Sequence, residues 1–480
     1  MPSKKFLPMT PEETAERGWD APDVVLVTGD AYVDHPSFAM AVIGRVLESA
    51  GYRVALLAQP AWTSASDFRK FGRPKLFFGV SAGNMDSMIN KYTHNRRIRS
   101  GDDYSPGGRA GLRPDRASII YSQRAREAYP DVPIVLGGIE ASMRRFAHYD
   151  YWSDKVRKSV LLDSKADLLV YGMGERPVLE IAGLLKAGVP VERIRGVRGT
   201  AYAVGRNEAG TAAPPGAVTL PSFEETAGDR VKFSTATRLI HEESNPYCAR
   251  PLVQFSDTRA VVQNPPSMPL TTEELDRIYD LPYARERHPS YREPVPALET
   301  VKDSIVIHRG CFGGCAFCSL GLHQGRFIQS RSRDSVLRET VKVAGRKDFS
   351  GFISDLGAPS ANMYRMAGRD KALCESCRRY SCLHPAICRN LDTGHGHSLD
   401  LLRSVRKIKG VKKAFVASGI RMDLALLCPE YIDEIAAFHT SGQLKVAPEH
   451  SSPGVLARMR KPVSGVFLEF AAAALHVAVL

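Results

Sequence analysis

The positions of the cysteines constrain this 480-residue chain more than any other feature. Seven of its nine cysteines fall between residues 311 and 388, while Cys248 and Cys428 stand apart. In a reducing compartment such a concentration favours metal binding over disulfide formation. The sequence therefore predicts metal chemistry in one short region of the C-terminal half.

The first cysteine group consists of Cys311, Cys315 and Cys318 and follows a predicted strand at 304–308. Gly313 and Gly314 permit a sharp turn between the cysteines, so that one tight loop can point three thiolates at a common centre. Thiolates suit iron–sulfur clusters and zinc alike. Three ligands rather than four leave a metal position open for a substrate or cofactor, as in catalytic metal sites.

The second cysteine group has the spacing CxxCx4Cx5C and predicts a second metal site. Its members are Cys374, Cys377, Cys382 and Cys388. Both an auxiliary iron–sulfur cluster and a closed structural zinc site fit four thiolates. A histidine can replace a thiolate ligand of zinc, so a zinc site stays an alternative. The nearby histidines are His384, His395 and His397. We favour a cluster, because we expect this loop to emerge beside the first group.

Residues 1–200 alternate between short apolar runs and segments with helical spacing. This alternation predicts an α/β fold with a doubly wound, Rossmann-like parallel sheet, whose ligands usually lie at the carboxyl ends of the strands. A helix is expected at 38–50, ending at Gly51. The expected strands are 24–28, 53–58, 75–80, 134–136 and 168–171.

Residues 201–300 are rich in proline and predict a connecting segment with one strand at 260–263 and one helix capped by Thr271 or Thr272. From 301 to 480 the alternation resumes and predicts a partial (β/α) barrel. A cysteine-rich insertion at 370–395 interrupts it. The expected barrel strands are 304–308, 352–354, 413–418 and 444–447, and the expected helices are 335–344, 398–408 and 429–438.

Several motifs resemble the bacterial YgiQ family of radical S-adenosylmethionine (SAM) proteins. The run from Arg309 to Cys318 carries the CxxxCxxC signature, with Phe317 before the last cysteine. Further matches span about residues 20–465, in the order expected along the chain: Asp34–Phe38, Gly51–Arg53, Val135–Ala141, Leu281–Tyr283, His288–Tyr291, His323–Arg326 and Asp355–Tyr364.

The resemblance implies a cobalamin-binding-like N-terminal domain followed by a radical SAM core. In such proteins three cysteines hold a [4Fe–4S] cluster, and its open iron binds SAM. Reductive cleavage then gives methionine and a 5′-deoxyadenosyl radical, with electrons from a reductant such as flavodoxin or ferredoxin. The substrate is not implied.

Five further positions in this chain are expected at the SAM site on the same resemblance. Phe317 corresponds to a residue near the adenine, and Gly357 to the glycine-rich turn that meets the SAM amino group, although Ala358 stands where many relatives have glycine. Ser418 and Arg421 are expected near the ribose or carboxylate. Glu449 is expected near the ribose hydroxyls.

The N-terminal domain departs from true cobalamin binders. It lacks their Asp-x-His-x-x-Gly pattern, because Asp34 and His35 are adjacent, so we expect no cobalamin. Both residues are expected to line a pocket. The glycine turns at 137–138 and 172–174 match the family. The arginine-rich stretch 92–116 predicts either a nucleic-acid surface or a solvated or anion-gripping loop.

The net charge of +13 favours an anionic partner or cofactor without distinguishing nucleic acid from a nucleotide-like ligand. Neither a signal peptide nor a membrane span is predicted, so a cytoplasmic location without a membrane partner is expected. The leading function is a radical SAM enzyme. Two alternatives stay open: a methylthiotransferase-like modifier of tRNA or ribosomal protein, and a non-catalytic zinc protein that binds nucleic acid.

Family barrels usually have six strands, whereas four are predicted here. The alanine-rich tail from residue 466 is interpreted as a fourth barrel helix cut short. We therefore expect a chain truncated at its C-terminus, which puts its full activity in question.

Overall fold

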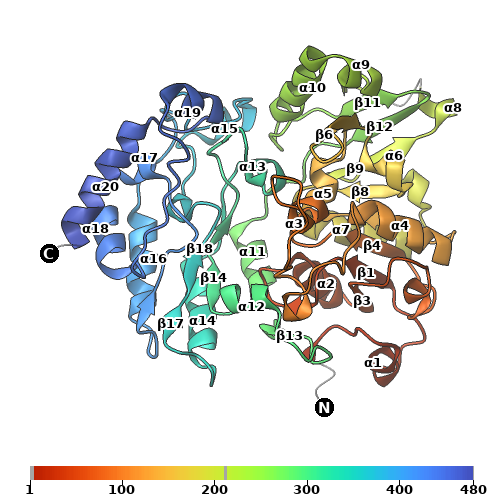
Figure 1. The fold of residues 1–480 in the computed structure, drawn as a ribbon, viewed down its shortest axis with the longest axis horizontal. Helices are drawn as coiled ribbons and strands as arrows, with labels where there is room; N and C mark the ends of the chain where they lie inside the picture. Colours follow the sequence, from red (N-terminus) through yellow and green to blue (C-terminus); the bar gives the residue numbers. More distant parts are fainter. Residues whose placement is uncertain (1–4, 210–212, 479–480) are drawn as a thin grey trace. The chain divides into compact units, whose positions relative to one another are not determined.

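The structure, a computed structural model, describes residues 5–209 and 213–478 (Figure 1). The chain divides into two compact units. Unit 1 comprises Met1–Met268 and Leu281–Glu299, and unit 2 comprises Pro269–Asp280 and Thr300–Leu480. All three tryptophans of the chain, Trp19, Trp62 and Trp152, lie in unit 1.

A nine-stranded mixed sheet forms the centre of the described part of unit 1. Five strands run parallel in the order β3-β1-β4-β5-β8, and β9, β12 and β11 continue the sheet in antiparallel pairs. The last strand, β10, pairs parallel with β11. The bounds are β1 Val24–Thr28, β3 Val54–Ala58, β4 Phe77–Ser81, β5 Ile134–Leu136, β8 Leu168–Val170, β9 Thr200–Val204, β10 Val218–Thr219, β11 Leu252–Ser256 and β12 Arg259–Gln263.

Helices cover both faces of this sheet, which explains why its central strands are apolar without alternation. All five residues of β1 are buried. Val25 and Val27 belong to the core that includes Tyr121 of α4 (Ala117–Ala128), whereas Leu26 approaches Gly44 of α2 (Ala39–Ser49). The other elements of unit 1 are α1 Pro11–Glu16, α3 Ser87–Lys91, α5 Gly138–Met143, α6 Val160–Ser164, α7 Glu175–Lys186, α8 Arg206–Ala209, α9 Phe223–Gly228, α10 Arg230–Glu242, β2 Val33–Asp34, β6 His148–Asp150, β7 Lys155–Arg157 and β13 Glu286–Arg287.

The segment 201–300 differs from the connecting segment that the sequence predicts. Strands β9 to β12 lie within or begin just before it, and they complete the sheet of unit 1. Helix α11, Thr272–Tyr279, belongs instead to unit 2 and begins with a capping box between Thr271 and Glu274. The prolines lie between these elements, and their frequency conceals the buried strands in the sequence.

Unit 2 contains short parallel strands alternating with helices, as a partial barrel requires. Strand β14 (Ser304–Val306) pairs with β18 (Asp355–Gly357), and β17 (Phe352–Ile353) pairs with β19 (Lys413–Ala414). Helices α14 (Arg333–Ala344), α16 (Gly396–Arg406) and α18 (Pro429–Phe438) follow in turn and share one apolar core with the strands. Helix α12, Pro296–Val301, begins in unit 1 and ends in unit 2. The other elements of unit 2 are α13 Leu320–His323, α15 Lys371–Ser376, α17 Met422–Ala425, α19 Pro453–Met459, α20 Ser464–Ala478, β15 His308–Arg309 and β16 Gln329–Ser330.

Three predicted barrel strands are corrected by the structure. The expected strand 413–418 is shortened to β19, Lys413–Ala414. Of the expected strand 444–447, only Val446 pairs with a neighbour, through a single parallel bridge to Ile420. The expected strand 304–308 divides into β14 and β15, and β15 pairs antiparallel with β16. None of the described helices combines the length and apolar character needed to cross a membrane.

Candidate metal centre

The first cysteine group lies in the loop between β15 and α13, and two glycines determine the path of this loop. Gly310 has φ +91°, and a Cβ there would lie 2.3 Å from the carbonyl oxygen of Phe327. Gly314 has φ +64°, and its Cβ would lie 2.6 Å from the Cβ of Ser381. Both positions therefore require glycine for conformational and steric reasons.

Two thiols of this loop lie beside Gly313, where a Cβ would be 3.3 Å from Cys311 Sγ and 3.9 Å from Cys315 Sγ. The Gly313 N–H donates to Cys311 Sγ at 3.4 Å. Burial raises the pKa of Cys311 to about 11; the Gly313 N–H opposes this rise, and the thiols of Cys315 and Cys318 add to it. Burial also raises the pKa of Cys318. Thiolates so placed need a positive centre to be stable, and a bound metal supplies one. The donor set fits an iron–sulfur cluster.

Arg421 reaches the first cysteine group. Its Nη1 donates to Cys315 Sγ at 3.6 Å, while Nε and Nη2 donate to the carboxylate of Asp423 at 2.9 and 2.6 Å. Its backbone exchanges two hydrogen bonds of 2.9 Å with the side chain of Asn362. The guanidinium is thereby held in place beside a thiol.

Gly357 and Ser418 lie together at the carboxyl ends of neighbouring strands. Ser418 Oγ accepts from the Ala358 N–H at 3.1 Å, and a Cβ on Gly357 would lie 2.7 Å from the same oxygen. Asp355 Oδ1 accepts from the backbone N–H groups of Ala417 and Ser418 at 2.7 and 3.1 Å. Burial raises the pKa of Asp355, and these hydrogen bonds oppose the rise. Asp355 was recognised in the sequence only as the first residue of the match Asp355–Tyr364 and not as a site residue, although an acid directly after the expected strand 352–354 was a signal.

The remaining two predicted positions lie near the third cysteine. Phe317 has a side chain that is 55% exposed, and Glu449 is exposed with φ +67°. Lys461 Nζ lies 3.4 Å from Glu449 Oε1. The Ala316 N–H donates to the Met459 carbonyl at 3.0 Å, which brings the segment that contains Lys461 to the loop of the third cysteine. Lys461 was missed because nothing in its local sequence relates it to residue 318.

Backbone hydrogen bonds join the second cysteine group in two pairs. The Cys377 N–H donates to the Cys374 carbonyl at 3.3 Å, and the Cys388 N–H donates to the Cys382 carbonyl at 2.8 Å. Burial raises the pKa of Cys382 to about 11, the Arg326 guanidinium opposes this, and the thiols of Cys388, Cys374 and Cys377 reinforce it. Asn390 Nδ2 donates to Cys374 Sγ at 3.3 Å. Over residues 5–209 and 213–478, no three His, Cys, Asp or Glu side chains stand close enough together for a single ion. Metal binding at both cysteine groups stays a prediction.

His395 lies away from the second cysteine group, contrary to its suggested role as a replacement ligand. Its Nε2 is 3.3 Å from Asn362 Nδ2, and its ring centroid is 4.5 Å from that of Tyr431. Burial lowers the pKa of His395 to about 4. It belongs to the interior of unit 2, where its ring packs on an aromatic neighbour.

In unit 1, Asp34 is a buried structural residue rather than a pocket residue. Its two oxygens accept from Arg45 at 3.1 and 2.5 Å, and Oδ2 also accepts from the Ala284 N–H at 2.8 Å. His35 is buried, and its Nδ1 accepts from the Ser37 N–H. This arrangement follows from burial, because an interior carboxylate requires a charged partner.

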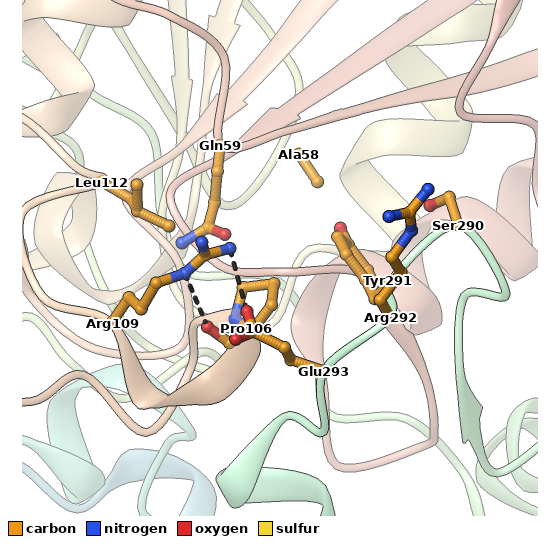
Figure 2. Close-up of a pocket in the computed structure, with 9 residues that line it drawn as sticks. All are labelled: Ala58, Gln59, Pro106, Arg109, Leu112, Ser290, Tyr291, Arg292 and Glu293. Atoms are coloured by element: carbon orange, nitrogen blue, oxygen red, sulfur yellow. Dashed lines mark hydrogen bonds and ion pairs between the residues drawn. The ribbon is translucent and has the colours of Figure 1, made fainter.

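A pocket of about 590 Å³ opens at the carboxyl end of β3 (Figure 2), and Asp34 is not one of the residues that line it. Arg109 and Glu293 form an ion pair of 3.2 Å on one side, and Tyr291 and Arg292 lie on the other. Gln59 Nε2 donates to Gly29 O and Ser105 Oγ. The lining residues are Ala58, Gln59, Pro106, Arg109, Leu112, Ser290, Tyr291, Arg292 and Glu293.

Half of the arginines of the stretch 92–116 are engaged with carboxylates. Arg113 is 1% exposed and lies 2.9 Å from both Asp30 and Asp102. Arg116 pairs with Asp150, and Arg109 pairs with Glu293. Arg113 and Arg116 pair with buried carboxylates and so serve the fold of unit 1, whereas the ion pair of Arg109 is exposed.

Comparison with known proteins adds sequence relatives. Residues 6–304 match a family profile described as Radical SAM N-terminal. A UPF0313 protein of Rhodopseudomonas palustris is 53% identical over 97% of this chain and 71% of its own length. The corresponding protein of Bradyrhizobium diazoefficiens is 52% identical, with 97% and 72% covered. The UPF0313 protein YgiQ of Escherichia coli K12 is 48% identical, with 97% and 70% covered.

Among solved structures, the radical SAM methyltransferase TsrM of Kitasatospora setae has a similar fold. One TsrM structure holds a tryptophan substrate and a SAM analogue, and another holds cobalamin and a [4Fe–4S] cluster. The TM-score is 0.52 at 16% identity for both. The matched region covers 95% of this chain in the first comparison, and this chain spans 66%, just under two thirds, of the TsrM chain.

Proposed function

The chain belongs to the UPF0313 (YgiQ) family of radical SAM proteins, and from this premise we propose that it is an iron–sulfur enzyme that cleaves SAM reductively. The observation that carries the proposal is the glycine-dependent loop that holds Cys311, Cys315 and Cys318. The Sγ atoms of Cys311 and Cys315 both lie within 4 Å of the position that a Cβ on Gly313 would take, and Arg421 donates to Cys315 Sγ.

Each residue of the site has a role in this proposal. The three cysteines hold a [4Fe–4S] cluster, which when bound supplies an open iron for SAM and the electron that cleaves SAM to methionine and a 5′-deoxyadenosyl radical. Arg421 supports the Cys315 thiolate. Gly357 and Ser418, with Asp355 behind them, offer a close-packed edge for the methionine part of SAM. Phe317 and Glu449 are proposed for its adenosine part.

The proposal includes partners and compartment. A cytoplasmic one-electron donor such as flavodoxin or ferredoxin reduces the cluster, and the substrate is unassigned. We also propose that unit 1 binds no cobalamin, because Asp34 is held by Arg45 and the cobalamin-ligand pattern is missing. One TsrM structure holds cobalamin, so the absorbance of protein reconstituted with cobalamin tests this point.

A second candidate is a methylthiotransferase-like modifier of tRNA or ribosomal protein. The observation in its favour is the close approach of the two cysteine loops, where the Cys382 N–H donates to the Phe312 carbonyl at 3.0 Å. A reaction that needs two clusters would use such an arrangement. A non-catalytic zinc protein that binds nucleic acid is the third candidate, and it requires a chain without iron.

The test is anaerobic purification, quantification of iron, sulfide and zinc, and incubation with SAM and dithionite. We expect at least about four irons per chain and formation of 5′-deoxyadenosine. Cys315→Ala should remove about four irons per chain and abolish formation of 5′-deoxyadenosine, whereas Cys428→Ala, which lies outside both cysteine groups, should change neither. A chain with zinc and no iron would overturn the proposal. If the chain holds iron and sulfide but forms no 5′-deoxyadenosine, the proposed cluster stands and the proposed cleavage of SAM is wrong.

A further inference from the structure

The loop of the second cysteine group lies directly against the loop of the first. The Cys382 N–H donates to the Phe312 carbonyl at 3.0 Å, and Ser381 Oγ donates to the Gly313 carbonyl at 2.7 Å. Ser381 also occupies the space beside Gly314 that a side chain there would need. The carbonyl groups between Cys311 and Cys315 are therefore positioned by residues 381 and 382.

Arg326 fixes the second loop from the side of the first. It lies eight residues after Cys318 in a buried position, and its guanidinium donates to the carbonyls of Arg379 and Cys377. Arg326 therefore ties residues 377 and 379 of the second loop to the segment that follows Cys318.

The two loops also share one small apolar core. Phe312 from the first loop packs with Leu383 and Leu391 from the second, and Cys311, Cys382 and Cys388 lie partly buried against this core. Between the end of α15 at Ser376 and the start of α16 at Gly396, the second loop has no helix or strand of its own. A segment of this kind gains order chiefly from cross-links, and a metal held by four thiolates is a strong cross-link.

We propose that Cys374, Cys377, Cys382 and Cys388 bind a thiolate-ligated metal centre of their own, and that this centre holds the Cys311–Cys318 loop in its ligating conformation. The proposal rests on the proposed function, because it takes Cys311, Cys315 and Cys318 as the site of the first cluster. Its metal is zinc or an iron–sulfur cluster, which share the same donor chemistry. The second centre is thus a brace for the first.

The test compares metal content and thiol accessibility in the full chain. Wild-type protein should hold about four irons plus one zinc, or about eight irons. The double variant Cys377→Ala/Cys388→Ala should lose the second metal, and the affinity of the first site for iron should fall about tenfold. Alkylation of Cys311, Cys315 and Cys318, followed by mass spectrometry, should become correspondingly faster. If the iron content and the protection of these cysteines from alkylation are both unchanged in the double variant, the second centre does not support the first, and the proposal is wrong.

Two gentler variants test the contacts without removing a cysteine. Ser381→Ala and Arg326→Ala should each lower iron occupancy of the first site, whereas the exposed Arg369→Ala, a matched control, should not. Circular dichroism verifies that the variants are folded. If Cys315→Ala leaves iron content unchanged, the proposed function fails. If Cys315→Ala removes iron while all second-loop variants keep it, only the proposed support of the first site by the second centre is wrong.

Discussion

At the scale of single residues, Arg421 connects the first cysteine group to the segment that follows β19 of the barrel. Its guanidinium is placed between Cys315 Sγ and the Asp423 carboxylate. A cation beside a ligand thiolate stabilises the more negative, reduced form of a cluster. We therefore expect the charge of Arg421 to affect the reduction potential of the cluster more than the fraction of chains that hold a cluster.

We predict that Arg421→Met shifts the midpoint potential of the first cluster to more negative values by on the order of 50 mV. The loss of the cation leaves Asp423 uncompensated, and both effects disfavour added negative charge. A redox titration followed by electron paramagnetic resonance measures the shift. The double variant Arg421→Met/Asp423→Asn, which removes both charges, should shift less. An unchanged or more positive potential in the single variant would contradict this role.

Gly314 and Gly325 offer a matched pair for the packing of the first loop. Both have positive φ, at +64° and +88°, but of the two only Gly314 has a neighbour, Ser381, within 4 Å of the position that a Cβ would take. Gly325→Ala should cost about 1 kcal/mol from backbone strain, and Gly314→Ala about 2–4 kcal/mol from strain and overpacking. Urea unfolding followed by circular dichroism measures both. Equal costs would show that the Ser381 contact is dispensable.

At the scale of elements, the arginine-rich stretch 92–116 stabilises the sheet of unit 1. Arg113 lies between Asp30 and Asp102, and its Nη1 donates to the Ala82 carbonyl just beyond β4. Arg113→Ala should lower the free energy of unfolding of unit 1 by about 3–5 kcal/mol, because it leaves buried carboxylates unpaired. Tryptophan fluorescence during urea unfolding reports this unit. Exposed Arg97→Ala is the control and should cost under about 0.5 kcal/mol; similar losses from both would refute the assignment.

The strand β15 contributes an acid-sensitive residue to unit 2. His308 is fully buried, its Nε2 lies 3.0 Å from the Ser360 carbonyl, and burial lowers its pKa to about 4. The unfolded chain binds a proton near pH 6.5 and the folded chain does not, so stability falls as the pH drops from 6.5 to 4. At pH 5 this amounts to about 2 kcal/mol relative to pH 7.

The matching experiment compares wild type with His308→Gln, which keeps a donor for Ser360 and cannot titrate. Urea unfolding at pH 7 and pH 5, followed by circular dichroism, should show a loss on acidification that is about 2 kcal/mol smaller in the variant. Identical losses in the two proteins would show that His308 does not contribute.

Sequence patterns predicted those elements whose own residues carry the signal. Strands β1 and β5 and helix α18 were predicted with their observed bounds, because apolar runs and amphipathic spacing are local properties. Strand β11 was missed among prolines, and the expected strand 444–447 is only a bridge, because pairing depends on distant partners. The same holds in the site. Cysteine spacing is local, whereas the approach of Asp355 to Ser418, of Lys461 to Cys318 and of Ser381 to Gly313 depends on the fold.

At the scale of the whole molecule, the net charge of +13 predicts non-specific attraction to polyanions. Binding to a random RNA at 50 mM salt should weaken at least about 100-fold at 200 mM salt, because counterion release dominates such binding. Fluorescence anisotropy with labelled RNA measures this. A tRNA that binds tightly at 200 mM, where the random RNA does not, would contradict a purely electrostatic origin and favour the RNA-modifying candidate.

Because all three tryptophans lie in unit 1, they can serve as energy-transfer donors for a distance measurement to unit 2. Iron–sulfur clusters absorb broadly where indoles emit, so a cluster on the cysteines of unit 2 is an energy-transfer acceptor for donors that all belong to unit 1. The fluorescence lifetime of the indoles, measured before and after cluster loading, then reports the separation of the two units in solution. Substitution of two of the three tryptophans by phenylalanine turns each remaining indole into a separate distance measurement.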